Sequence, residues 1–114
     1  MARIAITVLF LLTSLGFAQE APKKIAKGAV LTAAISRVQP DYPIAARQLK
    51  IEGDVELEAV IGENGSVEKV TIVSGNPVLT RAAVEALKRW KFTPFVEGGK
   101  PIRVTAPVSF AFKL

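Results

Sequence analysis

The end of the chain, from Ile102 to Leu114, alternates between apolar side chains and other side chains. The apolar set occupies every even position: Ile102, Val104, Ala106, Val108, Phe110, Phe112 and Leu114. Strict alternation predicts a β-strand with one face on a hydrophobic core and the other toward water. Proline has no N–H to donate to a strand ladder, so Pro107 indicates an edge strand or a bulge. An edge strand presents unpaired backbone groups, which favours a binding module over an enzyme.

A second alternating stretch predicts a neighbouring strand and a hairpin. Residues 54–61 place apolar side chains at the odd positions and, apart from Val60, acidic side chains at the even positions. Asn64 and Gly65 follow, and both residues accept the positive φ that tight hairpin turns require. We therefore expect the chain to return as a strand over residues 67–74. The apolar residues of that strand do not alternate cleanly, so its register stays open.

The longest helix is expected between the hairpin and the last strand. Asn76 is a suitable N-cap and Pro77 suits the first helical position, so we predict a helix that runs from there to about Arg89 or Trp90. Its apolar residues fall on one face at helical spacing. Trp90 is the only tryptophan. We interpret it as the anchor that locks the helix end onto the sheet, and an exposed aromatic that binds a partner is the alternative.

A shorter helix is expected ahead of the first strand. Pro43 suits its first position, and Ile44, Ala45 and Leu49 are expected to face the core. The order helix, strand, strand, helix, strand, with single-faced strands and amphipathic helices, predicts an α+β fold in two layers. We expect a three-stranded antiparallel sheet with the strand order 2-1-3 and both helices packed on one face.

The amino-terminal part resembles a secretory signal peptide followed by a linker. Residues 1–18 carry one early cation and an apolar run shorter than the roughly 20 residues of a membrane-spanning helix. Gly16 and Ala18 supply the small residues of a cleavage site. We expect cleavage after Ala18, and a short uncleaved N-terminal anchor is the alternative. Residues 19–35 are expected to be a linker, and residues 36–114 the folded domain.

Composition argues against most catalytic chemistry. The chain has no cysteine and no histidine, which removes thiolate sites, the commonest metal ligand and the commonest general base. No nucleophile–base pair or phosphate-binding glycine loop appears, so we expect no enzyme, no cofactor and no metal site. The formal net charge is +5, but the cations are scattered among carboxylates, so we expect no nucleic acid. The acidic residues of 54–58 are expected to pair with Lys69 and Arg103 across the strands.

A set of short motifs resembles one known family. The motifs are Gln39-Pro40-Asp41-Tyr42-Pro43, Ala46-Arg47, Ile51-Glu52-Gly53, Asn64-Gly65, Ala82-Ala83 and Arg89-Trp90-Lys91-Phe92-Thr93-Pro94. Over residues 36–114 the chain resembles the C-terminal domain of the energy-transducer TonB family. The resemblance implies a periplasmic domain to whose last strand an outer-membrane receptor's short amino-terminal box adds as an extra strand. It also implies that Gln39 and Pro40 lie against the receptor.

These inferences together predict a periplasmic TonB-like protein-binding module that docks an extended receptor box by strand addition, in TonB-dependent transport across the outer membrane. The residues expected to bind the partner are Gln39, Pro40, Arg103, Val104, Thr105, Ala106, Val108, Ser109 and Phe110. Two alternatives stay open. If residues 1–18 are retained, the chain is an inner-membrane-anchored energy-transducer component that works with a proton-driven motor complex. If two copies pair their edge strands, the chain is a homodimer with a structural role.

Overall fold

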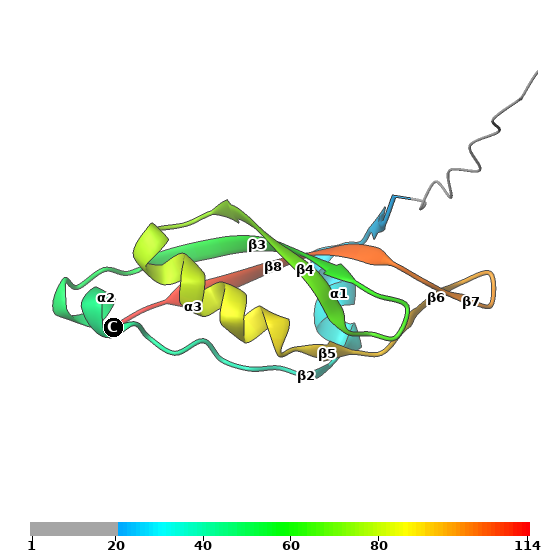
Figure 1. The fold of residues 1–114 in the computed structure, drawn as a ribbon, viewed down its shortest axis with the longest axis horizontal. Helices are drawn as coiled ribbons and strands as arrows, with labels where there is room; N and C mark the ends of the chain where they lie inside the picture. Colours follow the sequence, from blue (N-terminus) through cyan, green and yellow to red (C-terminus); the bar gives the residue numbers. More distant parts are fainter. Residues whose placement is uncertain (1–20) are drawn as a thin grey trace, which may run out of the picture.

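The fold is built on one main sheet. The computed structural model describes residues 21–114, and its main sheet has the strand order β1-β8-β3-β4 (Figure 1). These strands are β1 (Lys23–Lys24), β3 (Gly53–Ile61), β4 (Val67–Ser74) and β8 (Val104–Phe112). Two small sheets pair β2 (Ala34–Ser36) with β5 (Lys91–Phe92), and β6 (Phe95–Glu97) with β7 (Lys100–Ile102). The helices are α1 (Lys27–Ala33), α2 (Ile44–Gln48) and α3 (Pro77–Lys88).

The main sheet differs from the expected one at its outer edge. β4, β3 and β8 are antiparallel neighbours, but β1 adds in parallel to the far side of β8. The three expected strands β4, β3 and β8 follow the order 2-1-3, but the fourth, parallel strand means that the expected three-stranded antiparallel sheet is not confirmed. Lys23 and Lys24 carry no alternating pattern, so their pairing depends on tertiary contacts that the sequence does not display. The strand expected from Ile102 to Leu114 is also divided, because β7 ends at Ile102 and β8 begins at Val104.

The core lies on one face of this sheet. β3 and β8 pair without a break from Gly53 opposite Phe112 to Ile61 opposite Val104. The side chains predicted to face the core are buried along this ladder: Val55, Leu57, Ala59, Ile61, Val104, Ala106, Val108, Phe110 and Phe112. The prediction of single-faced strands is confirmed for β3 and β8. Helix α3 packs against β3 and β4, while α1 packs against β8 (Figure 1).

Helix α3 begins where the sequence predicts and ends at Lys88, one residue before the predicted end. The Asn76 side chain accepts a hydrogen bond from the backbone N–H of Val78 at 2.9 Å, and Pro77 takes the first helical position. Trp90, just beyond the helix, is 5% exposed, and its Nε1 donates to the carbonyl of Val38 at 3.0 Å. Its ring meets that of Phe110 edge-on, with centroids 5.6 Å apart. The interpretation of Trp90 as the anchor of the helix end is confirmed.

Helix α2 presents a different face from the expected one. Ile44 and Leu49 are 75% and 68% exposed, whereas Ala46 is fully buried. The prediction that Ile44, Ala45 and Leu49 face the core is therefore wrong. A helix of five residues has less than two turns, so its packing face is set by the chain on either side rather than by its own periodicity. α2 rests against α3, and α1 takes the place on the sheet that we expected α2 to occupy.

Residues expected to form the linker are ordered where the structure describes them. β1 and α1 fall within this stretch, and Val30 of α1 is fully buried in the core. The amide of Thr93 donates to the carbonyl of Ala33 at 2.9 Å, and β2 continues by pairing with β5. The chain from α1 onward is thus held to the domain by its own core contacts. The predicted signal peptide, residues 1–18, lies outside the described residues.

The turn between β3 and β4 brings the chain close to β5. Gly65 has φ +83°, and a Cβ at this position would lie 1.9 Å from the carbonyl oxygen of Phe92. The expected positive φ is found at Gly65 and not at Asn64, whose side chain instead accepts from the Ser66 amide at 3.1 Å.

Among residues 21–114, no helix is long and apolar enough to cross a membrane.

Candidate functional site

The candidate site is the outer edge of β8, which is the side of the strand that faces away from β3. The backbone groups of β8 point alternately toward β3 and toward this edge. The carbonyls of Arg103 and Thr105 accept hydrogen bonds from the amides of Lys23 and Ile25, at 3.2 and 3.1 Å. Residues of a strand direct both backbone groups to one side, and that side alternates with every residue. The odd residues of β8 therefore point their backbone N–H and C=O away from β3, toward the outer edge.

Pro107 ends the pairing between β1 and β8. In a parallel ladder, the next bond would run from the backbone nitrogen of residue 107 to the carbonyl of Ile25, and proline has no hydrogen to give. Beyond it, the outward N–H and C=O groups belong to Ser109 and Ala111. No backbone hydrogen bond from the described residues reaches these groups on the outer side. The edge thus has a covered half before Pro107 and an open half after it.

The even residues of the predicted site are turned inward. Val104 and Ala106 are fully buried, Val108 is 3% exposed and Phe110 is 7% exposed. Their side chains lie in the core and their backbone groups face β3, so the structure does not present these four residues on the outer edge. Arg103, Thr105 and Ser109 do lie on the outward side.

Two residues of the outer edge were missed in the sequence prediction. Pro107 and Ala111 share the outward orientation of Ser109, and Ala111 is exposed. The signal that identifies them is the same alternation that predicted the strand, because a period of two assigns backbone direction as well as side-chain direction.

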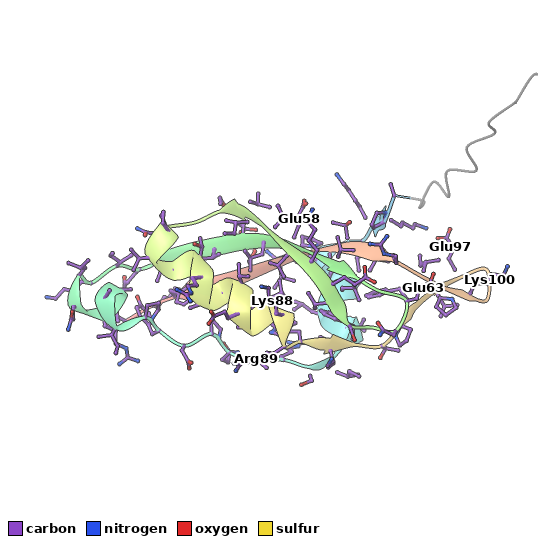
Figure 2. All side chains as sticks on the ribbon, viewed as in Figure 1. Glu58, Glu63, Lys88, Arg89, Glu97 and Lys100 are labelled. Atoms are coloured by element: carbon purple, nitrogen blue, oxygen red, sulfur yellow. The ribbon has the colours of Figure 1, made fainter. Side chains whose placement is uncertain are left out.

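The charged residues around β8 form other pairs than those expected. Arg103 contacts Glu68 at 2.9 Å, and Glu58 stands opposite Pro107 on one side and Thr71 on the other. The expected pairing of Glu58 and its acidic neighbours with Lys69 and Arg103 is therefore wrong, because the register puts uncharged residues beside Glu58. Figure 2 shows Glu63, Glu97 and Lys100 at the end of the molecule that carries β6 and β7.

Gln39 and Pro40 lie apart from the β8 edge, against the end of α3. They line a shallow hollow together with Ala82, Ala86 and Arg89. Gln39 is exposed and Pro40 is half-buried. The link between this hollow and β8 is Trp90, which contacts the Phe110 ring and donates to the carbonyl of Val38. The buried side chain of Trp90 therefore contacts both β8 and the segment that leads into Gln39 and Pro40.

Tyr42 fixes the rest of the motif that contains Gln39. Its hydroxyl donates to the carbonyl of Ile51, and its ring meets that of Phe112 edge-on at 5.6 Å. Loss of hydration raises the pKa of Tyr42, the nearby Glu52 carboxylate adds to the increase, and Arg47 opposes it. The motif is thus tied to the beginning of β3 and to the end of β8.

The chemistry of this surface is that of strand pairing. Hydrogen-bond donors and acceptors spaced along an open strand edge accept an extended chain as a further strand. Within the described part of the chain, no group of three or more acidic side chains is arranged to hold a metal ion.

Known proteins share both the sequence and the fold of this domain. Residues 38–114 match the family described as Gram-negative bacterial TonB protein C-terminal. The chain is 37% identical over 81 residues to Protein TonB of Vibrio cholerae serotype O1, an alignment that covers 69% of this chain and 33% of that protein. It is 39% identical over 70 residues to Protein TonB of Escherichia coli K12, covering 60% and 28%.

A solved structure agrees with the family match. The solution NMR structure of the Pseudomonas aeruginosa TonB CTD superposes with a TM-score of 0.60 at 29% identity, covering 71% of this chain and 84% of that one. The alignments span about a third of the length of the two curated relatives. The α+β fold and the matched residues together establish that the chain belongs to the family of Gram-negative bacterial TonB C-terminal domains.

Proposed function

We propose that this domain is a periplasmic protein-binding module of TonB-dependent transport, and that it takes up an extended receptor peptide as an additional strand on the outer side of β8. The observation that carries the proposal is the pair of outward backbone groups at Ser109 and Ala111, which have no backbone partner among residues 21–114 on that side. The partner is the short amino-terminal box of an outer-membrane receptor. No cofactor takes part, because binding requires only backbone pairing and surface contacts.

The buried residues of β8 and its outward backbone groups have different roles, which supports this proposal. Phe110 and Phe112 hold the strand in the core, so its outer side stays straight and preorganised when a partner arrives. Main-chain hydrogen bonds to Ser109 and Ala111 supply affinity without reading sequence. The half-buried side chains of Thr105 and Pro107, on the sheet face opposite the core, contact alternate side chains of the added strand.

Gln39 and Pro40 form a second contact in this proposal. Gln39 is exposed at the hollow beside α3, where its amide is able both to donate and to accept hydrogen bonds. Because Trp90 joins this segment to β8, a receptor that touches both places meets a rigid pair of contacts. The two contacts together then select the partner.

The proposal includes secretion through residues 1–18 as a cleaved signal peptide, followed by a linker over residues 19–35 and the domain proper. The alternative is a retained anchor in the inner membrane, with the domain facing the periplasm and coupled to a proton-driven motor. Mass measurement of the protein purified from its native envelope separates the two. A mature chain that begins at Gln19 supports secretion, and an intact chain from Met1 supports the anchor.

A homodimer is the second candidate, and the exposed side chains of β4 favour it. Ile72 and Val73 are 50% and 59% exposed on the strand at the opposite edge of the sheet. Pairing of two such edges would cover the flanks of these side chains with the partner strand. Light scattering after size exclusion tests this, because a monomer at high concentration would exclude the dimer.

Nuclear magnetic resonance titration tests the main proposal. Adding a synthetic receptor-box peptide to isotope-labelled protein is expected to shift the amide signals of Ser109 and Ala111 most strongly. The amides of Leu57 and Ala59, inside the sheet, serve as internal controls and are expected to move little. Shifts confined to β4, or no shifts at saturating peptide, would refute docking on β8.

A further inference from the structure

Residues 21–27, which we name the amino-terminal arm, run along the covered half of the β8 edge. We propose that the arm is an internal occupant of the docking surface: an incoming peptide pairs first with Ser109 and Ala111, and then displaces the arm from Arg103 and Thr105. This inference rests on the proposed function and adds to it. It makes the docking surface longer than its open half and gives the free protein a strand that competes with the partner.

The contacts of the arm are those that an added strand would make. Lys23 and Ile25 donate their amides to the carbonyls of Arg103 and Thr105, at 3.2 and 3.1 Å. The side chain of Lys27 reaches past the end of β1 and donates from Nζ to the Ser109 Oγ at 2.6 Å. The arm therefore fills the positions of a partner strand before Pro107 and touches the open half through one side chain.

Most contacts of the arm exchange easily, although the half-buried side chain of Ile25 also packs against the core. β1 has two residues, both exposed, and its one ion pair, between Lys23 and Glu97 at 3.2 Å, joins side chains that are 60% and 56% exposed. Exposed ion pairs contribute little to stability, and a peptide strand replaces the backbone bonds with equivalent ones. Val30 of α1 is fully buried, so displacement stops within the first turn of the helix.

Pro107 sets the order of events. On its far side, an incoming strand finds Ser109 and Ala111 without a backbone bond to break. On its near side, each new bond to Arg103 or Thr105 requires that the arm gives up one of its own. Strand exchange therefore begins in the open half and proceeds toward β7. The docked arm lowers the apparent affinity, because only molecules whose arm has left the edge offer its covered half to the peptide.

Two proline variants of the arm test the inference in the full-length chain. The Lys23 amide bonds to β8, whereas Lys24, between two bonded residues, directs its amide away. Lys23→Pro therefore removes a bond to the edge, and Lys24→Pro is the matched control that keeps it. Lys23→Ala controls for the ion pair, since it loses the side chain and keeps the amide.

The readout is the affinity for a synthetic receptor-box peptide, measured by calorimetry. We expect Lys23→Pro to bind the peptide about fivefold more tightly than the wild type, because one backbone bond of the competitor is lost. Lys24→Pro and Lys23→Ala are expected to bind within about twofold of the wild type. Equal affinities for the two proline variants would overturn the proposal.

Hydrogen exchange of single amides gives an independent readout. In the free wild-type protein, the amides of Lys23 and Ile25 are expected to be protected, and saturating peptide is expected to remove that protection. The amide of Ala34, which donates to the carbonyl of Val30, is the control and is expected to stay protected. Peptide-induced shifts at Ser109 and Ala111, with Lys23 and Ile25 still protected, would refute displacement and leave the proposed function intact. Absence of shifts on β8 in both the wild type and Lys23→Pro would refute the two together.

Discussion

The two sides of β8 use one strand for opposite purposes. Its inner side pairs with β3 residue by residue from Val104 to Phe112, and the even side chains fill the core. Its outer side pairs with the arm through backbone bonds at Arg103 and Thr105 and then, after Pro107, makes none with the described residues. The difference shows that an alternating pattern specifies a surface as well as a core, because every residue that faces inward leaves a neighbour that faces outward.

The largest effect on stability is expected when an inward side chain of β8 is removed. Phe110→Ala should lower the free energy of unfolding by about 3–5 kcal/mol, because a buried aromatic ring is lost and a cavity remains beside Trp90. Urea denaturation followed by tryptophan fluorescence measures the change. A loss below about 1 kcal/mol would contradict the inner role assigned to Phe110.

A smaller effect is expected where the inner side supports the Gln39 contact. Trp90→Phe keeps an aromatic ring in the core and removes the Nε1 donor to Val38, which should cost about 1–2 kcal/mol. We expect lower amide order parameters at Gln39 than in the wild type, because Val38 loses the bond that holds it. Unchanged order parameters there would show that Val38 and Gln39 are held by other contacts.

A pH dependence is expected at the end of β8 that Tyr42 contacts. Folding raises the pKa of Tyr42 above the usual value of about 10, so the folded state binds this proton more tightly than the unfolded state. The corresponding stability is fully present below pH 10 and is lost as the pH rises through the folded pKa. Denaturation of wild type and Tyr42→Phe between pH 8 and about 12 should show the advantage of the wild type shrinking over this window. A constant difference would contradict the assignment.

The smallest effect is expected on the outer side. Ser109→Ala removes a half-buried hydroxyl and its bond to Lys27, and should change the free energy of unfolding by at most about 0.5 kcal/mol. The same urea series measures it. A cost comparable to that of Phe110→Ala would mean that the outer side of β8 is structural and not reserved for a partner.

Much of the inner side of the fold could be predicted from the sequence. Alternation placed Val55 and Val108 in the core, and the Asn76–Pro77 pair fixed the beginning of α3, because both patterns depend on local geometry. The packing of α2 could not be predicted, because five residues give no reliable periodicity.

The candidate site was predictable in part. Pro107 indicates an edge strand, but the even residues of the predicted site are buried, because a period of two assigns the direction of backbone groups together with that of side chains. β1 could not be predicted, since Lys23 and Lys24 are poor strand formers that pair with β8 through a tertiary contact.

The central claim is that the outward amides of β8 bind the partner, and one pair of variants tests it most directly. Ser109→Pro removes an outward N–H, while Ser109→Ala keeps it, and both lose the bond to Lys27. Proline at this edge position, like Pro107, breaks no bond to β3, so both variants are expected to fold. We predict that Ser109→Pro binds a receptor-box peptide roughly tenfold more weakly than Ser109→Ala, as expected for loss of one hydrogen bond. Equal affinities of the two folded variants would contradict the account.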